Sequence, residues 1–144
     1  MDDTTTLTAR VKAKARELGF LECAVIPAGR LSGEEAHFDR WLEQDMQGEM
    51  HYMERNRDKR LDPTLLVENA RTVIVVLQNY YPAKQQKDAE APVLSKYAYG
   101  TDYHFVMKEK LNQLLEFIRS EAGECSGRPF VDSAPVLERA WARR

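Results

Sequence analysis

The sequence has few cysteines, with only Cys23 and Cys125 among its 144 residues. The two lie far apart and do not have the spacing of a metal site. Because a four-iron cluster normally takes four cysteine ligands, these residues cannot hold such a cluster by themselves. Cys23 lies in an apolar run and is interpreted as a small buried residue. Cys125 lies in a loop that contains glycines and is given no role.

Long apolar runs are missing as well. The longest purely apolar run, residues 73–77, is much too short to span a bilayer. The acidic, threonine-rich start of the chain lacks the basic-then-apolar layout of a secretory signal. We therefore expect a cytoplasmic protein that makes no contact with a membrane.

The sequence also has no large excess of positive or negative charge, since its formal net charge is -2 at pH 7. This balance gives no global reason to expect nucleic acid, so any RNA contact would depend on local basic patches such as residues 55–60. Internal repeats, a glycine-rich phosphate loop, a nucleophile elbow and a histidine-rich zinc motif are also absent. Their absence argues against the common nucleotide, hydrolase and zinc chemistries.

The residues that are present predict a single α+β domain over residues 1–144, with helices packed on a mixed sheet. Apolar spacing predicts a first helix through residues 7–18, a second after a capping box at 32–35, and a long third helix after Gly100. Apolar or extended patterns predict strands at 20–26, 72–77, 93–99 and 130–131. The run 72–77 is typical of a strand covered on both faces, so it is expected at the centre of the sheet.

The short apolar run 130–131 precedes Asp132 and a predicted final helix. Ser133 can cap that helix, and Pro135 is tolerated at an early helical position because it needs no donor there. Asp132 is therefore expected at a strand-to-helix junction. The local pattern leaves two interpretations open, a carboxylate that caps the helix and a carboxylate that is presented to a ligand.

Four stretches of the chain occur in an order that is similar to a known family. They are residues 48–53 (Gly-Glu-Met-His-Tyr-Met), 57–63 (Arg-Asp-Lys-Arg-Leu-Asp-Pro), 95–104 (Ser-Lys-Tyr-Ala-Tyr-Gly-Thr-Asp-Tyr-His) and 132–139 (Asp-Ser-Ala-Pro-Val-Leu-Glu-Arg). Together they resemble the epoxyqueuosine reductases, which use cobalamin and iron–sulfur clusters to finish the queuosine modification of transfer RNA. The resemblance covers most of the chain and implies a nitroreductase-like cobalamin-binding domain.

The resemblance also implies roles for individual residues. Arg60 and Ser95 match positions that contact cobalamin, and Asp132 matches both a cofactor contact and the proposed proton donor. Arg139 matches an arginine near the modified base, although a surface ion pair with Glu138 or Glu35 would equally explain a charge there. The resemblance implies no protein ligand for the cobalt. An exposed aspartate has a pKa near 3.9, so an acid role for Asp132 requires burial, for which Phe130 and Val131 are candidates, or a neighbouring anion.

The resemblance ends with residue 144. Relatives continue with a glycine-rich segment that completes the cobalamin site and with a ferredoxin-like module that carries two four-iron clusters, and these have no counterpart here. One interpretation is the N-terminal part of an epoxyqueuosine reductase, which acts on transfer RNA only with the missing segments. The alternative is a non-catalytic corrinoid-binding or structural module, a homo-oligomer formed through apolar surface exposed by truncation.

Overall fold

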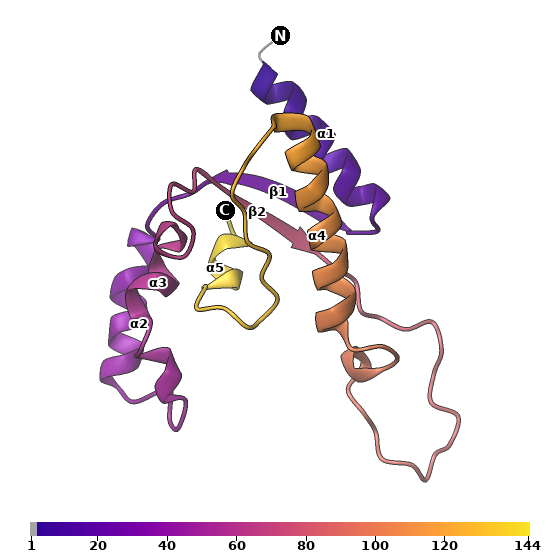
Figure 1. Cartoon of the computed structure of the whole chain (residues 1–144). Helices are drawn as coiled ribbons and strands as arrows, with labels where there is room; N and C mark the ends of the chain where they lie inside the picture. Colours follow the sequence, from indigo (N-terminus) through magenta and orange to yellow (C-terminus); the bar gives the residue numbers. More distant parts are fainter. Residues whose placement is uncertain (1–2) are drawn as a thin grey trace. The chain divides into compact units, whose positions relative to one another are not determined.

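A computed structural model of the chain describes residues 3–144 (Figure 1). The chain forms two compact units, each described by itself below: Met1–Cys23 with Val76–Cys125, and Ala24–Val75 with Ser126–Arg144. Its elements are, in order, α1 (Asp3–Glu17), β1 (Glu22–Pro27), α2 (Ser32–Glu43), the 3₁₀ helix η1 (His51–Met53), α3 (Arg57–Leu61), the 3₁₀ helix η2 (Pro63–Leu65), β2 (Thr72–Leu77), the 3₁₀ helix η3 (Lys96–Ala98), α4 (Tyr103–Ala122) and α5 (Glu138–Trp141).

The sheet of the described chain has two strands, β1 and β2. The Leu21 N–H donates to the Leu77 carbonyl (2.7 Å) and the Ala28 N–H donates to the Arg71 carbonyl (2.8 Å), so the strands run antiparallel. The α+β class is confirmed. The expectation of a mixed sheet with β2 at its centre is wrong, because the described residues add no third strand and the middle of β2 is only partly buried.

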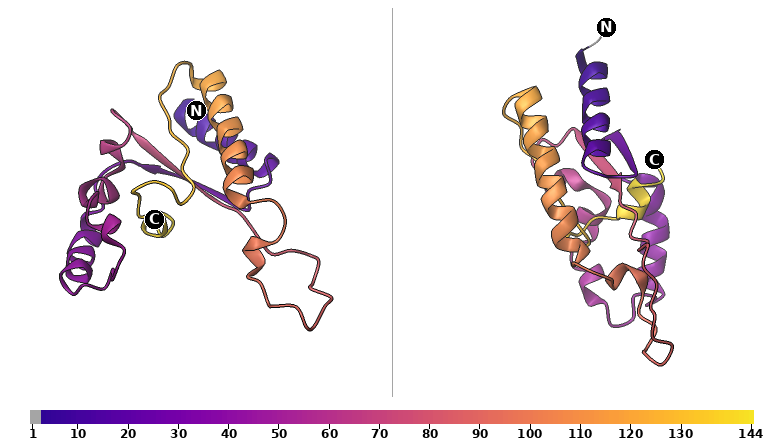
Figure 2. Two further views of the ribbon diagram at one scale, coloured as in Figure 1. Left: turned by 60° about the horizontal axis from the view of Figure 1, so that its bottom comes forward. Right: turned by 90° about the vertical axis from the view of Figure 1, so that its right-hand side faces the viewer.

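The strand expected at 93–99 does not form, because this segment has no ladder partner and instead turns into η3. Val93 is 93% exposed to solvent, so this segment is not a strand that other elements cover. The composition of residues 83–92, rich in Lys, Gln, Asp and Glu, predicts an exposed loop, and this loop is present. Figure 2 shows it as part of a long segment without helices or strands between β2 and η3.

The first unit is built on the packing of α1 against α4 (Figure 1). Val11 and Ala15 of α1 and Leu114 of α4 are buried, so the apolar stripe predicted for the long helix does face a core. The carboxylate of Asp102 caps α4 by accepting the His104 N–H at 2.9 Å. No helix in residues 3–144 combines the length and the apolar composition of a membrane span.

The second unit is built on a cluster of four buried side chains, called the Trp141 cluster below: Leu31, Phe38, Leu61 and Trp141. Partly buried residues of β1, β2, α2 and the C-terminal segment pack around it. Trp41 packs against this core, and its ring stacks on Phe38 with centroids 6.0 Å apart. The capping box expected at residues 32–35 does not form, because α2 already begins at Ser32 with Leu31 as its N-cap.

The C-terminal segment differs from the expectation. Residues 130–131 form no strand, and α5 begins at Glu138 with Leu137 as its N-cap, so neither Ser133 nor Pro135 starts the helix. The reason is a tight turn in which the Ser133 N–H donates to the Val131 carbonyl at 2.6 Å. The backbone at Asp132 is left-handed, with φ 53°, which prevents a direct passage from strand to helix.

Candidate functional site

Arg60 is a buried cation at the end of α3, with 8% of its surface exposed. Its Nε donates to the carbonyl of Met53 (3.2 Å) and its Nη2 donates to the carbonyl of Tyr52 (3.1 Å). Among residues 3–144 no carboxylate pairs with this guanidinium, and burial lowers its pKa. A desolvated cation without a counter-charge favours a ligand that brings electron-rich oxygens to it.

Arg57, one turn earlier on the same helix, has the opposite environment. Its guanidinium donates to both carboxylate oxygens of Asp39 at 2.6 Å and to Glu35 at 2.8 Å. Arg30 and Arg57 together lower the pKa of Glu35 to about 2. Arg57 therefore joins α3 to α2, and its charge is already matched by protein carboxylates.

Asp132 lies in the turn that precedes α5, called the 131–137 loop below. Val131 before it is buried, but Asp132 itself is exposed, so the burial expected from Phe130 and Val131 is not found. The reason is the left-handed backbone at Asp132, which turns the chain sharply at this residue. The other condition for an acid role, a neighbouring anionic group, is met by Glu138.

Glu138 contacts Asp132 through the backbone. Its Oε1 accepts the backbone N–H of Asp132 at 3.2 Å, which brings the two acidic residues together. Desolvation and, next, the charge of Asp132 raise the pKa of Glu138. Two neighbouring carboxylates disfavour each other's charged form, so the proximity of Glu138 is the kind of environment that an acid role at this loop requires.

Arg139 follows Glu138 on α5 and is exposed. The ion pairs considered for it, with Glu138 or Glu35, do not occur among residues 3–144, where Glu35 is engaged by Arg30 and Arg57. Its guanidinium is therefore accessible to a ligand from solvent. This position is compatible with the expected substrate contact.

Three of the four expected site residues belong to the second unit, namely Arg60, Asp132 and Arg139, whereas Ser95 belongs to the first. Leu61, next to Arg60, and Trp141, at the end of α5, are both members of the Trp141 cluster. One core thus supports the helix that carries Arg60 and the helix that carries Glu138 and Arg139. Ser95 is exposed and precedes η3 with its backbone extended.

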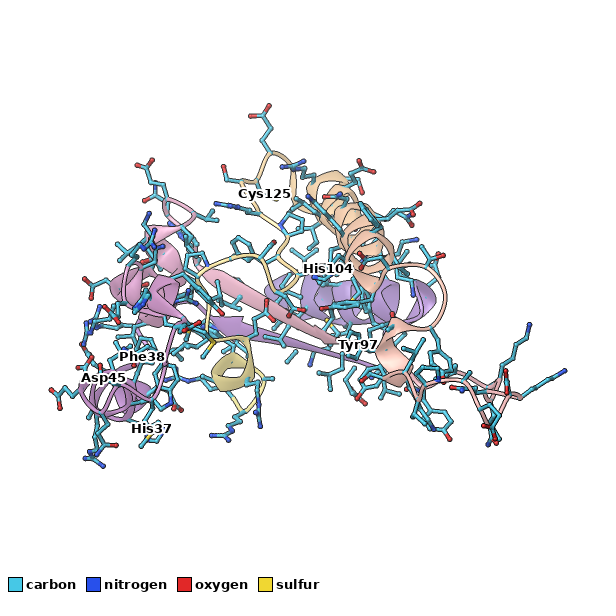
Figure 3. All side chains as sticks on the ribbon, turned by 90° about the horizontal axis from the view of Figure 1, so that it is seen from below. His37, Phe38, Asp45, Tyr97, His104 and Cys125 are labelled. Carbon is cyan, nitrogen blue, oxygen red and sulfur yellow. The ribbon has the colours of Figure 1, made fainter. Side chains whose placement is uncertain are left out.

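The segment that leads into α4 carries a group of exposed or partly exposed rings, and Figure 3 labels two of them, Tyr97 and His104. The Tyr103 ring meets Tyr97 edge-on (6.0 Å) and stacks on His104 (4.1 Å). Nδ1 of His104 lies 2.7 Å from a carboxylate oxygen of Asp102. These contacts fix the rings beside the N-terminus of the helix. A polar and aromatic rim for a large flat ligand stays a prediction.

The buried guanidinium of Arg60 fits a cofactor such as cobalamin, whose periphery is rich in amide and phosphate oxygens. The described residues contain no group of three histidine, cysteine, aspartate or glutamate side chains arranged to hold a metal ion. The two cysteines of the sequence do not suffice for a four-iron cluster. Cys23 is buried in β1 as expected.

Comparison with solved structures identifies the fold. A structure of a selenomethionine-labelled epoxyqueuosine reductase superposes with a TM-score of 0.80 at 24% identity, over 97% of this chain and 38% of that one. A structure of an epoxyqueuosine reductase with an epoxyqueuosine-modified tRNA-Tyr stem loop gives a TM-score of 0.76 at 24% identity, over the same shares of the two chains. The fold is therefore that of part of an epoxyqueuosine reductase.

Sequence comparison identifies the family. The family model described as "Epoxyqueuosine reductase QueG, DUF1730" matches residues 60–133. The epoxyqueuosine reductase of Cellulophaga algicola is 54% identical over 134 residues, which is 93% of this chain and 44% of that protein. The chain belongs to the epoxyqueuosine reductase family. It spans less than half the length of this curated relative.

Proposed function

We propose that this chain is the cobalamin-binding, aspartate-bearing part of an oxidoreductase that reduces epoxyqueuosine to queuosine in transfer RNA. The observation that carries the proposal is the family match over residues 60–133, which spans Arg60, Ser95 and Asp132. The relative solved with a modified tRNA stem loop supports transfer RNA as the partner. With such a substrate the reaction would take place in the cytoplasm.

In this proposal Arg60 and Ser95 hold the cofactor. Arg60 is fixed by two backbone carbonyls and has no carboxylate partner in the part of the chain that the structure describes, so it can donate to cofactor oxygens. Cobalamin, when bound and reduced, supplies the electrons that open the epoxide. The iron–sulfur clusters of the family lie outside these 144 residues, because the chain lacks their ligands.

Asp132 supplies the proton that the departing epoxide oxygen or the ring carbon needs. An exposed aspartate is a weak candidate for such a role near neutral pH. The neighbouring Glu138 strengthens this candidate, because a carboxyl group held beside another one disfavours the charged form of the pair. Arg139, exposed on the same helix as Glu138, would contact the transfer RNA near the modified base.

The proposal is tested with a chimera in which residues 1–144 replace the matching segment of the Cellulophaga algicola reductase. The chimera should convert epoxyqueuosine to queuosine in tRNA, which nucleoside analysis by mass spectrometry would detect. Asp132→Asn should lower its kcat by about 100-fold or more while leaving cofactor binding intact. Glu68→Gln, at an exposed glutamate of the same unit, is the matched control. Undiminished turnover in Asp132→Asn would refute the acid role.

The role of Arg139 is tested in the same chimera by charge reversal. Arg139→Glu should raise KM for tRNA several-fold, because it replaces a phosphate-attracting cation by an anion. Arg139→Lys, which keeps the charge, should have a smaller effect. A KM that does not respond to Arg139→Glu would remove this residue from the tRNA contact.

Cofactor binding is tested on the 144-residue chain by titration with cob(II)alamin, followed by visible and paramagnetic resonance spectra. We expect the axial base to be lost on binding, and Arg60→Ala to weaken binding at least tenfold. Arg55→Ala, at an exposed arginine of the same unit, should bind as the unaltered chain does. If Arg60→Ala and the unaltered chain bind equally well, Arg60 is not a cofactor residue.

The alternative function is a non-catalytic corrinoid-binding or structural module that forms a homo-oligomer. The observation that favours it is a set of strongly exposed apolar side chains in the first unit: Tyr80, Tyr81, Val93, Leu94 and Phe105. Analytical ultracentrifugation across a concentration series would detect such an oligomer. An inactive chimera together with a stable dimer would favour the alternative.

A further inference from the structure

The 131–137 loop packs into the protein at both of its ends. Val131 at its start is buried, and Val136 and Leu137 at its end pack against the Trp141 cluster. Asp132, between these anchors, is exposed and has a left-handed backbone. A residue other than glycine is strained in this conformation, so the surrounding structure must hold it there.

Glu138 contributes one contact to the backbone of Asp132. This side chain starts from the first turn of α5, three residues before the buried Trp141, and reaches back over six residues to accept the Asp132 N–H at 3.2 Å. The backbone of α5 is itself fixed, because the Trp141 N–H donates to the Leu137 carbonyl at 3.2 Å. Glu138 therefore links the exposed turn to a segment that the core immobilises.

We propose that Glu138 is a positioning residue for Asp132, which it fastens to α5 through the Asp132 backbone N–H. This inference rests on the proposed function, because it assigns to Glu138 the task of presenting the proposed acid. Holding the backbone of the turn at this residue fixes the position from which the Asp132 side chain is presented. Glu138 itself need not touch the substrate.

The raised pKa of Glu138 agrees with this geometry. Desolvation is the largest cause and the charge of Asp132 the second, as expected for a carboxyl group that lies close to another one. The charged neighbour that follows on the same helix, Arg139, is exposed and forms no ion pair with Glu138 among residues 3–144.

The test uses NMR on the 144-residue chain and its variants Glu138→Ala and Glu138→Gln. Alanine removes the acceptor, so amide hydrogen exchange at Asp132 should become about three- to tenfold faster, and the heteronuclear NOE of residues 132–134 should fall. Glutamine keeps a side-chain oxygen that can accept the same N–H, so exchange at Asp132 should stay within about twofold of the unaltered chain. The Leu21 amide, paired in the sheet, should be protected equally in all three proteins.

A second measurement does not depend on how well the alanine variant folds. Carbon-detected titration of the Glu138 carboxyl group should show its pKa falling toward the ordinary value in Asp132→Asn, because the facing charge is removed. Unchanged amide exchange in Glu138→Ala, or an unchanged Glu138 pKa in Asp132→Asn, would each overturn the proposal. Neither measurement requires catalysis. An inactive chimera would therefore count against the proposed function while leaving this result standing.

Discussion

Replacing Trp141 by alanine should strongly destabilise the second unit. The Trp141 side chain is 1% exposed and belongs to one buried cluster with Leu31, Phe38 and Leu61. Truncation of a buried tryptophan typically costs about 3–5 kcal/mol, because apolar contacts are lost and a cavity remains. For a chain of this length the loss corresponds to a fall in Tm of about 10 °C or more. Urea unfolding followed by circular dichroism would measure it.

Phenylalanine is the matched variant at this position. The indole Nε1–H of Trp141 is buried without a hydrogen-bond partner in the described part of the chain, and such an orphan donor costs about 1–3 kcal/mol. Trp141→Phe removes the orphan donor while keeping one aromatic ring in the cluster. Its net effect should therefore stay within about 1.5 kcal/mol of zero. If alanine cost less than about 1 kcal/mol, or phenylalanine as much as alanine, the assignment of Trp141 as the central side chain of this core would be refuted.

Two further predictions concern the ion pairs of α2 and the end of α4. The folded-state pKa values of Glu35 and Asp39 lie below their ordinary values, so their contribution to stability is present above pH of about 4.5 and is lost as the pH falls toward 2. Arg57→Gln should flatten this decline in Tm, and an equally steep decline in the variant would contradict the reasoning. Gly123 has φ 81°, so Gly123→Ala should cost about 1–2 kcal/mol in urea unfolding. Gly33→Ala, in open space on α2 with no positive φ, should cost nothing, and equal effects at both glycines would contradict the conformational explanation.

Elements that depend on local pattern were predictable from the sequence. The apolar stripe of α4 repeats at helical spacing, and Leu114 is indeed the residue buried most deeply in that helix. Asp62 and Pro63 likewise have the pattern of a helix start, and the Asp62 carboxylate accepts the Thr64 N–H at 3.0 Å. Each of these features is decided within a few residues of the chain, where propensity and capping act.

Features that depend on distant partners were not predictable. Residues 93–99 and 130–131 have extended character, but strands form only where a ladder partner lies alongside, and the sequence does not reveal the partner. The burial of Trp141 could not be predicted either, because α5 has only four residues, too few to show the apolar spacing of an amphipathic helix.

The candidate site was predicted in part for the same reason. The motif indicated the residue types at Arg60 and Asp132, but not the isolation of Arg60 from carboxylates, which depends on packing. The Asp132–Glu138 contact could not be predicted from the sequence, because it requires a left-handed backbone at Asp132 itself, where glycine would be the usual choice. An aspartate in such a place, just ahead of a Pro-containing turn, is the one signal that could have suggested it.

The left-handed backbone at Asp132 has a consequence for protein engineering. With φ 53°, this position would be more stable as glycine, which relieves about 1 kcal/mol of strain, and asparagine is also well tolerated there. A selection for thermostability alone would therefore enrich the very substitutions that remove the proposed acid. Libraries built on this family for heat tolerance should keep residue 132 fixed, since stability and the proposed acid role favour different side chains at this position.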